Sequence, residues 1–267
     1  MPYWFIRPIA WVVFHLCYIF FGGIRFQGRE HVPKKGGVLI TPNHISDADP
    51  PTVAIALPRD AWVMAKEEIF SMKIIGPFSR WLHGFPVKRY TADRAALRRA
   101  EELLKEGNAV IIFPEGKLSP DGQIQPLLPG VLLIAKGADV PIVPTILIGT
   151  DKIIPYGSTT PRPSGKRTIV RFGPPVTVAE LTGGGKGSAA MHRGAERLRE
   201  LMLALQRGEP YPERPAEAAP ETPTEAETPP SEPGVKTPPE SARNDEETDA
   251  QPVAPLNAQT EEFQGKL

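Results

Sequence analysis

A short apolar run, Val38–Ile40, leads directly into a polar loop, and a helix-like segment begins at Thr52. A buried strand followed by a loop and a helix is typical of open α/β sheets, where ligands collect beyond the carboxyl ends of the strands. The loop carries His44 and Asp49, five positions apart. A neutral imidazole can take a proton from a hydroxyl, and a carboxylate can hold that imidazole in the right tautomer. The stretch therefore predicts an α/β fold with a catalytic loop at a strand end.

Two later apolar runs also end in polar residues. The run 109–113 is the clearest buried strand of the chain and continues into Glu115 and Gly116, where glycine lets the backbone approach a ligand. The run 83–87 continues into two cations, of which Arg89 is the better phosphate clamp because its planar fork binds two oxygens. Three polar elements at strand ends together predict one shared site.

The other elements follow from hydrophobic periodicity and turn residues. We expect further strands over 61–65, 140–149 and 168–172, and helices over 92–107, 131–136 and 191–205. The prolines within 140–149 indicate an edge strand, a bulge or irregular pairing, because proline cannot donate to a ladder.

The N-terminal segment 1–29 is apolar and aromatic. Its strictly apolar part, 8–23, is shorter than the roughly 20 residues that a spanning helix needs, and no signal-type cleavage site follows it. Arg7 and Arg25 flank the run, and its Trp and Tyr side chains favour a membrane interface. We expect a helix that lies in or dips into one leaflet. A short spanning anchor and a buried core helix are the alternatives.

Charge divides the chain into a basic body and an acidic tail. The tail, 209–267, holds 14 acidic and 4 basic residues with 12 prolines, whereas the body, 1–208, holds 17 acidic and 27 basic residues. The tail has too few large apolar residues to offset its ordering entropy, so we expect it to be disordered. The domain prediction is thus a membrane-associating helix (1–29), a catalytic domain (30–208) and this tail. A basic body favours anionic partners, but no stripe of interleaved cations and aromatics indicates nucleic acid.

The cysteine count restricts the chemistry further. Cys17 is the single cysteine, so an internal disulfide framework and a cysteine-rich zinc site are excluded. Its apolar neighbours predict a packed thiol. A hydrolytic metal site on His44, Asp47 and Asp49 is an alternative from another enzyme class, but no second histidine stands at metal-ligand spacing. We therefore expect no metal.

Read together, the strand-end motifs resemble the glycerolipid acyltransferase family that includes the 1-acylglycerol-3-phosphate acyltransferases. The segment 43–49 resembles the family's His-x4-Asp block, 85–89 its second block, 113–116 its Phe-Pro-Glu-Gly block, and 140–144 its fourth. The resemblance covers roughly 28–157 with the blocks in the right order. It implies an α/β fold with a central mixed sheet flanked by helices.

The resemblance also implies roles. His44 would be the general base on the acceptor hydroxyl, and Asp49 would orient it. The candidate substrate-binding residues are polar or glycine positions of the blocks: Asn43, Ser46, Arg89, Glu115, Gly116 and Lys117. The implied reaction moves an acyl group from acyl-CoA or acyl carrier protein to the sn-2 hydroxyl of 1-acyl-sn-glycerol 3-phosphate, giving phosphatidic acid. It needs no cofactor and no covalent acyl-enzyme. The implied location is peripheral or monotopic, at the cytoplasmic face of a membrane.

Two of the blocks depart from the family pattern. His83 stands where the second block begins with glycine, and Lys117-Leu118 stands where the third block continues Thr-Arg. Losing that arginine removes a bidentate phosphate donor, and lysine is not its equivalent. The acceptor alternatives are therefore a lysophospholipid, an ornithine lipid or glycerol 3-phosphate. A non-catalytic membrane protein with a decayed site is a further alternative, which the intact His44 and Asp49 oppose.

Overall fold

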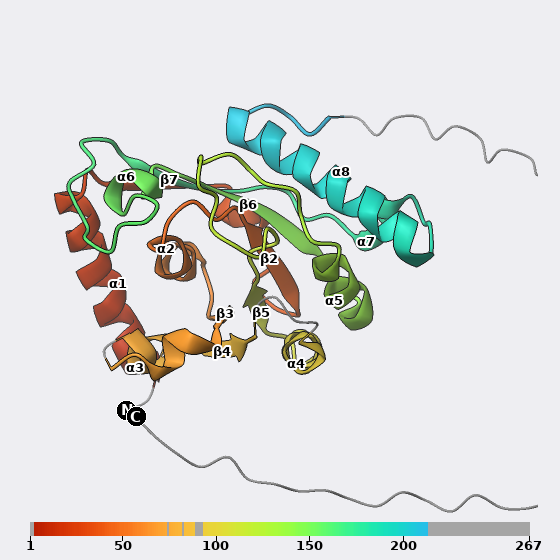
Figure 1. The fold of residues 1–267 in the computed structure, drawn as a ribbon, viewed down its shortest axis with the longest axis horizontal. Coiled ribbons are helices and arrows are strands. Elements are labelled where there is room, and N and C mark those ends of the chain that lie inside the picture. The colour runs from red at the N-terminus through yellow and green to blue at the C-terminus, as the bar shows by residue number, and fades with distance from the viewer. Residues whose placement is uncertain (1–2, 74, 82, 89–92, 213–267) are drawn as a thin grey trace, which may run out of the picture. The chain divides into compact units, whose positions relative to one another are not determined.

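The computed structural model describes residues 3–73, 75–81, 83–88 and 93–212 (Figure 1). Its strands form a seven-stranded sheet in the order β1-β7-β6-β2-β5-β3-β4. The strands are β1 Ile24–Gln27, β2 Val38–Pro42, β3 Ala61–Lys66, β4 Gly84–Val87, β5 Ala109–Ile111, β6 Ile142–Ile148 and β7 Thr168–Phe172. The α-helices are α1 Tyr3–Phe20, α2 Asp49–Ala56, α3 Ile75–Trp81, α4 Arg94–Lys105, α5 Gly130–Ala138, α6 Thr150–Ile153, α7 Val178–Thr182 and α8 Gly187–Arg207. Most of the predicted acidic tail, 213–267, lies outside the described residues.

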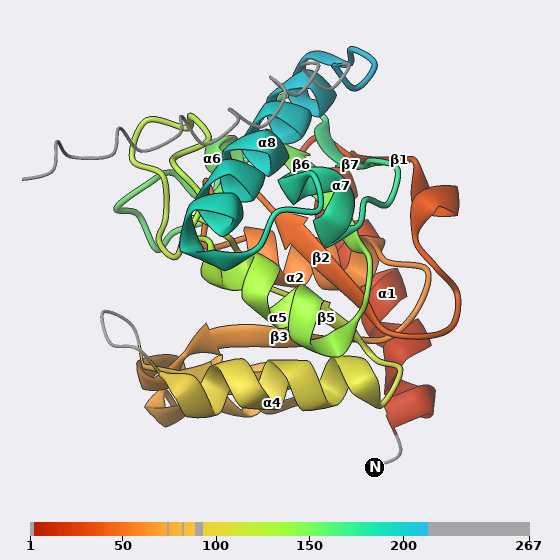
Figure 2. The ribbon, with the colours of Figure 1, turned by 90° about the vertical axis from the view of Figure 1, so that its right-hand side faces the viewer.

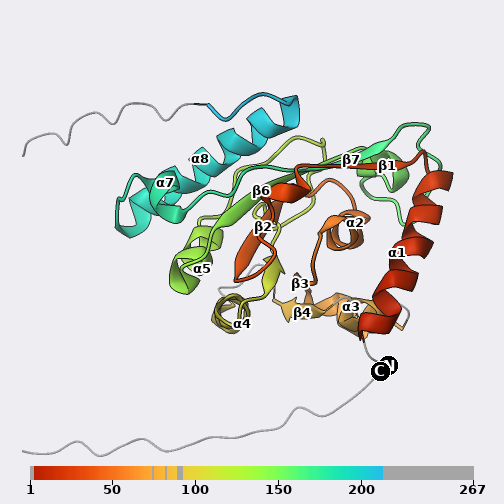
Figure 3. The same cartoon turned by 180° about the vertical axis from the view of Figure 1, so that it is seen from behind.

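Helices cover both faces of the sheet, which explains why its central strands read as unbroken apolar runs. On β2, Leu39 packs into a core with side chains of α4, α5 and α8, while Val38 and Ile40 pack on the opposite face with side chains of α2. Figure 2 shows α4, α5 and α8 in front of the sheet, and Figures 1 and 3 show α2 between α1 and the strands. The prediction of an α/β fold with a mixed sheet flanked by helices is confirmed.

The topology brings the predicted loops together. β2 is the central strand, and it pairs in parallel with both β5 and β6. The carboxyl ends of these three strands therefore meet at one edge of the sheet, which is where an α/β protein builds its site. The loop after β2 thus lies beside the loop after β5. β4, which precedes the Lys88 position, is separated from β5 by β3.

The expectation of an edge strand around Pro144 is wrong, whereas that of irregular pairing is confirmed. Between the pairs Thr145–Phe172 and Ile142–Val176, two residues of β6 lie opposite three residues of the segment after β7. β6 lies inside the sheet, parallel to β2 and antiparallel to β7. The carbonyl of Pro144 accepts the N–H of Gly173 at 2.8 Å, just beyond the final β6–β7 pair, Thr145–Phe172. In an antiparallel pair, the N–H and C=O groups of one residue point to the same neighbouring strand. The nitrogen of Pro144, which has no hydrogen to donate, therefore points to the segment after β7, where the regular β6–β7 ladder has ended.

Within residues 11–20, helix α1 turns most of its apolar side chains to solvent. Leu16 is 61% exposed and Ile19 is 71% exposed, so the buried-core alternative is wrong for this part of the helix. Cys17 is also exposed, and the expectation of a packed thiol is wrong because this cysteine lies on the outer side of the helix. Among the helices of the described ranges, none has the length and hydropathy needed to cross a bilayer.

Candidate active site

His44 and Asp49 form a buried pair at the carboxyl end of β2. The Nδ1 atom of His44 lies 3.0 Å from Oδ2 of Asp49. The same carboxylate oxygen accepts the backbone N–H groups of Ile45 and Ser46, each at 2.7 Å. Asp49 is the first residue of α2, followed by Pro50, a residue suited to the first turn of a helix. The loop is therefore wound around the carboxylate that holds the imidazole.

The hydrogen bonds determine which nitrogen of His44 carries the proton. An ionised carboxylate only accepts hydrogen bonds, so Nδ1 is the protonated nitrogen and Nε2 keeps its lone pair. Within the described part of the chain, Nε2 has no hydrogen-bond partner. The ring packs against Phe113, with a centroid separation of 4.1 Å and an angle of 32° between the ring planes. This arrangement suits a general base that acts through Nε2.

Glu115, predicted to bind the substrate head, supports the loop between β2 and α2, which carries His44. Its Oε1 accepts the backbone N–H of His44 at 2.9 Å, and its Oε2 accepts the N–H of Gln125 at 2.9 Å. Burial raises the pKa of the Glu115 carboxyl above its ordinary value, and these two backbone donors offset part of the rise. Glu115 therefore ties the loops after β2 and β5 together. A direct contact with substrate stays a prediction.

Glu115→Gln is expected to lower the free energy of unfolding by about 1–3 kcal/mol, because the amide turns an NH2 group toward one of the two backbone donors. A raised carboxyl pKa also gives wild type a stability contribution that is complete below pH 4.5, the ordinary pKa, and declines as pH rises through the raised value. The stability difference between wild type and variant should thus narrow above pH 4.5. Urea unfolding at several pH values measures it, with Glu196→Gln on the exposed face of α8 as control. A difference that widens with pH would contradict the assignment.

Two other predicted binding residues, Asn43 and Ser46, also hold the backbone. Asn43 is fully buried and exchanges two hydrogen bonds with Leu147 of β6: its Nδ2 donates to the carbonyl at 3.2 Å, and its Oδ1 accepts the N–H at 2.7 Å. Ser46 donates its hydroxyl to the carbonyl of Ile154 at 2.8 Å. These bonds pin the loop to β6 and to the end of α6, and substrate contact by either side chain stays a prediction.

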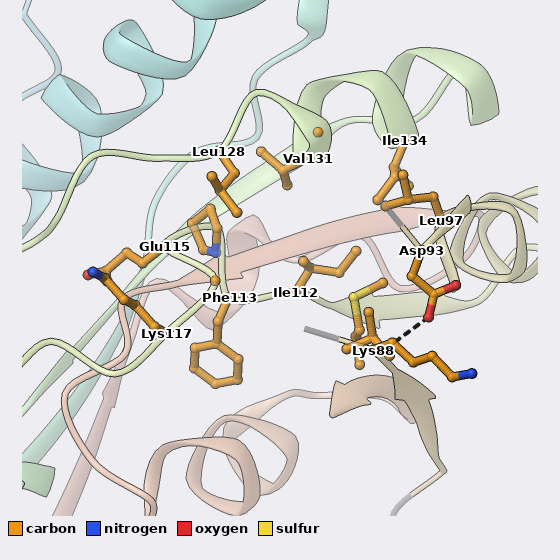
Figure 4. Close-up of a pocket in the computed structure, with 15 residues that line it drawn as sticks. Lys88, Asp93, Leu97, Ile112, Phe113, Glu115, Lys117, Leu128, Val131 and Ile134 are labelled. Carbon is orange, nitrogen blue, oxygen red and sulfur yellow. Dashed lines mark hydrogen bonds between the residues drawn. The ribbon is translucent and has the colours of Figure 1, made fainter. Parts of the chain in front are cut away.

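Gly116 and Lys117 lie at an apolar pocket of about 540 Å³ (Figure 4). Gly116 has φ 71°, a left-handed conformation that favours glycine. Lys117 is exposed, so its ammonium group is available at the pocket. The apolar lining comes from β3, β4, α4, α5 and the β5 loop: Met64, Val87, Leu97, Ile112, Phe113, Leu128, Val131 and Ile134. Phe113 contacts both this pocket and His44, and so joins the two.

The sequence did not indicate the α4 and α5 contributions to this pocket. The spacing of apolar residues in α4 predicts a buried face, and Leu97 belongs to that face. Which space the face borders depends on how α4 sits against α5. At the start of α4, Asp93 accepts the N–H of Lys88 at 2.8 Å and caps the helix through the N–H of Ala96. Arg89, the predicted phosphate clamp, lies outside the described residues.

The hydrolytic metal alternative finds no ligand cluster in the described ranges, where no three His, Cys, Asp or Glu side chains could hold an ion together. Asp47 is exposed, whereas Asp49 is fully buried and already engaged by three donors. The two carboxylates do not converge on one point.

Part of the chain matches a family of known proteins. Residues 23–148 match the family described as acyltransferase. The 1-acyl-sn-glycerol-3-phosphate acyltransferase of Bacillus subtilis is 34% identical over 129 residues, which are 48% of this chain and 64% of that protein. The alpha enzyme of the same name from Homo sapiens is 27% identical, over 64% of this chain and 61% of that protein. The chain thus spans less than two thirds of the length of these curated relatives.

A solved structure agrees with these matches. The crystal structure of the 1-acyl-sn-glycerophosphate acyltransferase from Thermotoga maritima superposes with a TM-score of 0.59 at 26% identity, covering 77% of this chain and 79% of that one. The segment 23–148 therefore matches the acyltransferase family, and the fold that carries the His–Asp pair resembles that of a solved acyltransferase. The resemblance to the 1-acylglycerol-3-phosphate acyltransferases is confirmed.

Proposed function

We propose that this protein transfers a fatty acyl group from an acyl thioester, acyl-CoA or acyl carrier protein, to the sn-2 hydroxyl of 1-acyl-sn-glycerol 3-phosphate. The product is phosphatidic acid, a precursor of phospholipids. The observation that carries the proposal is the buried His44–Asp49 pair, 3.0 Å apart, inside the segment that matches the family. The names of the relatives support the choice of acceptor.

The pair suggests a direct transfer. Nε2 of His44 takes the proton of the acceptor hydroxyl as its oxygen attacks the thioester carbon. An ester C–O bond forms, the C–S bond breaks, and the proton passes from the imidazolium to the leaving thiolate. Asp49 stabilises the imidazolium in between. The neighbouring hydroxyl of Ser46 already donates to the carbonyl of Ile154, which argues against serine as a nucleophile. Neither a metal nor a cofactor is needed for these steps.

The surroundings suggest where the substrates bind. The apolar pocket beside Phe113 is suited to an acyl chain, and Lys117 at the pocket is suited to an anionic group as a point charge. Arg89 remains the proposed bidentate phosphate ligand.

Acyl transfer to a panel of acceptors tests the proposal. The purified full-length chain is given acyl-CoA or acyl carrier protein thioesters with 1-acyl-sn-glycerol 3-phosphate, lysophospholipid, ornithine lipid or glycerol 3-phosphate, and mass spectrometry identifies the product. We expect phosphatidic acid from the first acceptor. Transfer only to another acceptor would point to the Lys117-Leu118 departure. The absence of transfer from either donor would leave the family resemblance without this activity.

We also propose that α1 holds the enzyme peripherally at the cytoplasmic face of a membrane. Leu16→Glu, on the exposed side of α1, is expected to weaken binding to vesicles of phosphatidylcholine and phosphatidylglycerol by about tenfold or more, because burial of a leucine in an apolar phase is lost. Cosedimentation measures the bound fraction. Leu133→Glu on α5 is the matched control, since Leu133 is 54% exposed and leucine is replaced by the same charge. Equal binding of Leu16→Glu and wild type would contradict the anchoring role.

A further inference from the structure

One side chain of α1 points the opposite way from its exposed neighbours. Tyr18 is 5% exposed, whereas Ile19 is 71% exposed. The hydroxyl of Tyr18 forms a buried hydrogen bond with Oγ1 of Thr52, on the first turn of α2. The same helix α2 begins at Asp49. Tyr18 therefore joins the apolar N-terminal helix to the element that carries the catalytic carboxylate, and neither the motifs nor the fold assigns it a role.

The direction of this hydrogen bond follows from the number of protons. Thr52 has one hydroxyl proton, and it is donated to the carbonyl of Ala48. Oγ1 of Thr52 can therefore only accept from Tyr18, and Tyr18 is the donor. The two hydrogen bonds therefore run in one direction, from Tyr18 through Thr52 to the carbonyl of Ala48. The peptide bond that contains this carbonyl also contains the backbone nitrogen of Asp49.

The carboxylate of Asp49 uses only one of its oxygens in hydrogen bonds with the described residues. All three donors to Asp49 use Oδ2, while Oδ1 is buried and has no partner among the described residues. Burial raises the pKa of Tyr18 to about 12, and the nearby charge of Asp49 adds to the rise. Tyr18 is therefore a neutral hydrogen-bond donor, and it is close enough to the catalytic carboxylate to feel its charge.

We infer that Tyr18 is a positioning residue for the His44–Asp49 pair, which it orients through Thr52 and the Ala48 carbonyl. The inference rests on the proposed acyl transfer and extends it to α1. Helix α1 is apolar on its exposed face, and its inner face supports the turn that leads into Asp49. Docking of α1 at a lipid surface would thereby fix the general base at the interface where the acceptor lipid is found.

Tyr18→Phe tests this inference because it removes one oxygen and keeps the ring. Tyr156→Phe, at a position that is 58% exposed, is the matched control. We expect Tyr18→Phe to lower kcat for acyl transfer about fivefold to tenfold, with little change in KM and in vesicle binding. A merely structural tyrosine would lower thermal stability without this selective loss of kcat.

A second readout does not need turnover. In protein with 15N-labelled histidine, the Nδ1–H resonance of His44, assigned by its loss in His44→Ala, reports the bond to Asp49. We expect Tyr18→Phe to shift this resonance and Tyr156→Phe to leave it in place. If wild type transfers no acyl group, the proposed function fails, and this resonance alone then decides the positioning role.

The two hydrogen bonds can also be tested at Thr52. Thr52→Val removes the hydroxyl and preserves the branched shape, so the double variant Tyr18→Phe/Thr52→Val should lose no more activity than the more affected single variant. Fully additive losses, or an unshifted His44 resonance in Tyr18→Phe, would overturn the inference.

Discussion

His44→Ala is expected to lower kcat for acyl transfer by about 10²- to 10⁴-fold, the range that a positioned general base contributes. The variant lacks the lone pair that removes the hydroxyl proton, and no other described side chain of the loop is a base in the same position: Asn43 is committed to β6 and Glu115 to two backbone N–H groups. Binding should change less than turnover, so KM should stay within a fewfold range. Initial rates over a range of both substrates measure the two quantities separately.

The control for this prediction is His192→Ala. His192 is exposed on α8, so the same side-chain truncation is made away from the site. Because His44 packs against Phe113 and donates to Asp49, its variant should also be checked by circular dichroism and thermal unfolding. A folded His44→Ala protein that transfers acyl groups at the wild-type rate would show that His44 is not the base. If the activity then proved to come from another protein in the preparation, the alternative of a non-catalytic membrane protein would be revived.

The convergence of the site could be predicted from sequence because it follows from a general property of parallel strands. Val38–Ile40 and the run 109–113 both read as buried strands that end in polar residues, and such ends collect at one edge of the sheet. The structure places β2 and β5 side by side, with Val38 opposite Ala109. The His44–Asp49 contact was predictable for a second reason. It joins residues five positions apart, so only the local turn has to form.

The partners of Glu115 and Asn43 could not be predicted in the same way. Both side chains bond to backbone groups, and most of these lie far away in sequence: Leu147 is 104 positions from Asn43, and His44 is 71 positions from Glu115. Backbone donors and acceptors are the same at every residue except proline, so composition carries no signal of which one faces a side chain. The sequence indicates that Glu115 is a carboxylate at a strand end, but it does not show whether this carboxylate binds backbone groups or a substrate.

The pairing of β6 and the apolar pocket depend on tertiary packing. Pro144 looks like an edge signal until β7 is known to end beside it, and β7 is contributed by a segment more than twenty residues later. The periodicity of α4 marks Leu97 as inward-facing, but the space between α4 and α5 is a property of both helices together. The sequence does not distinguish Tyr18 from the other N-terminal aromatic residues. Because the exposed side of α1 is also apolar, the spacing of apolar residues does not show which side of the helix is buried.

Asp49→Asn is expected to lower kcat by about 10³- to 10⁴-fold, as loss of the orienting carboxylate does in comparable catalytic groups. With the amide oxygen in place of Oδ2, the two backbone N–H groups stay bonded, but the charge that stabilises the imidazolium is gone and the NH2 group is buried at the unpartnered Oδ1 position. With the amide reversed, NH2 faces these N–H groups and His44 takes the wrong tautomer. Either orientation impairs the base.

Asp47→Asn separates this effect from a general loss of charge in the loop, because Asp47 is exposed and two positions away. It should retain near-wild-type kcat. Asp49→Asn should also lose stability, so its kcat is measured at a temperature where circular dichroism shows the folded protein. If folded Asp49→Asn keeps more than about a tenth of the wild-type kcat, the carboxylate acts only as a cap of the loop, and imidazolium stabilisation must come from another group. If it is as inactive as His44→Ala, the double variant should be no worse than either one, because two members of one catalytic unit are not additive.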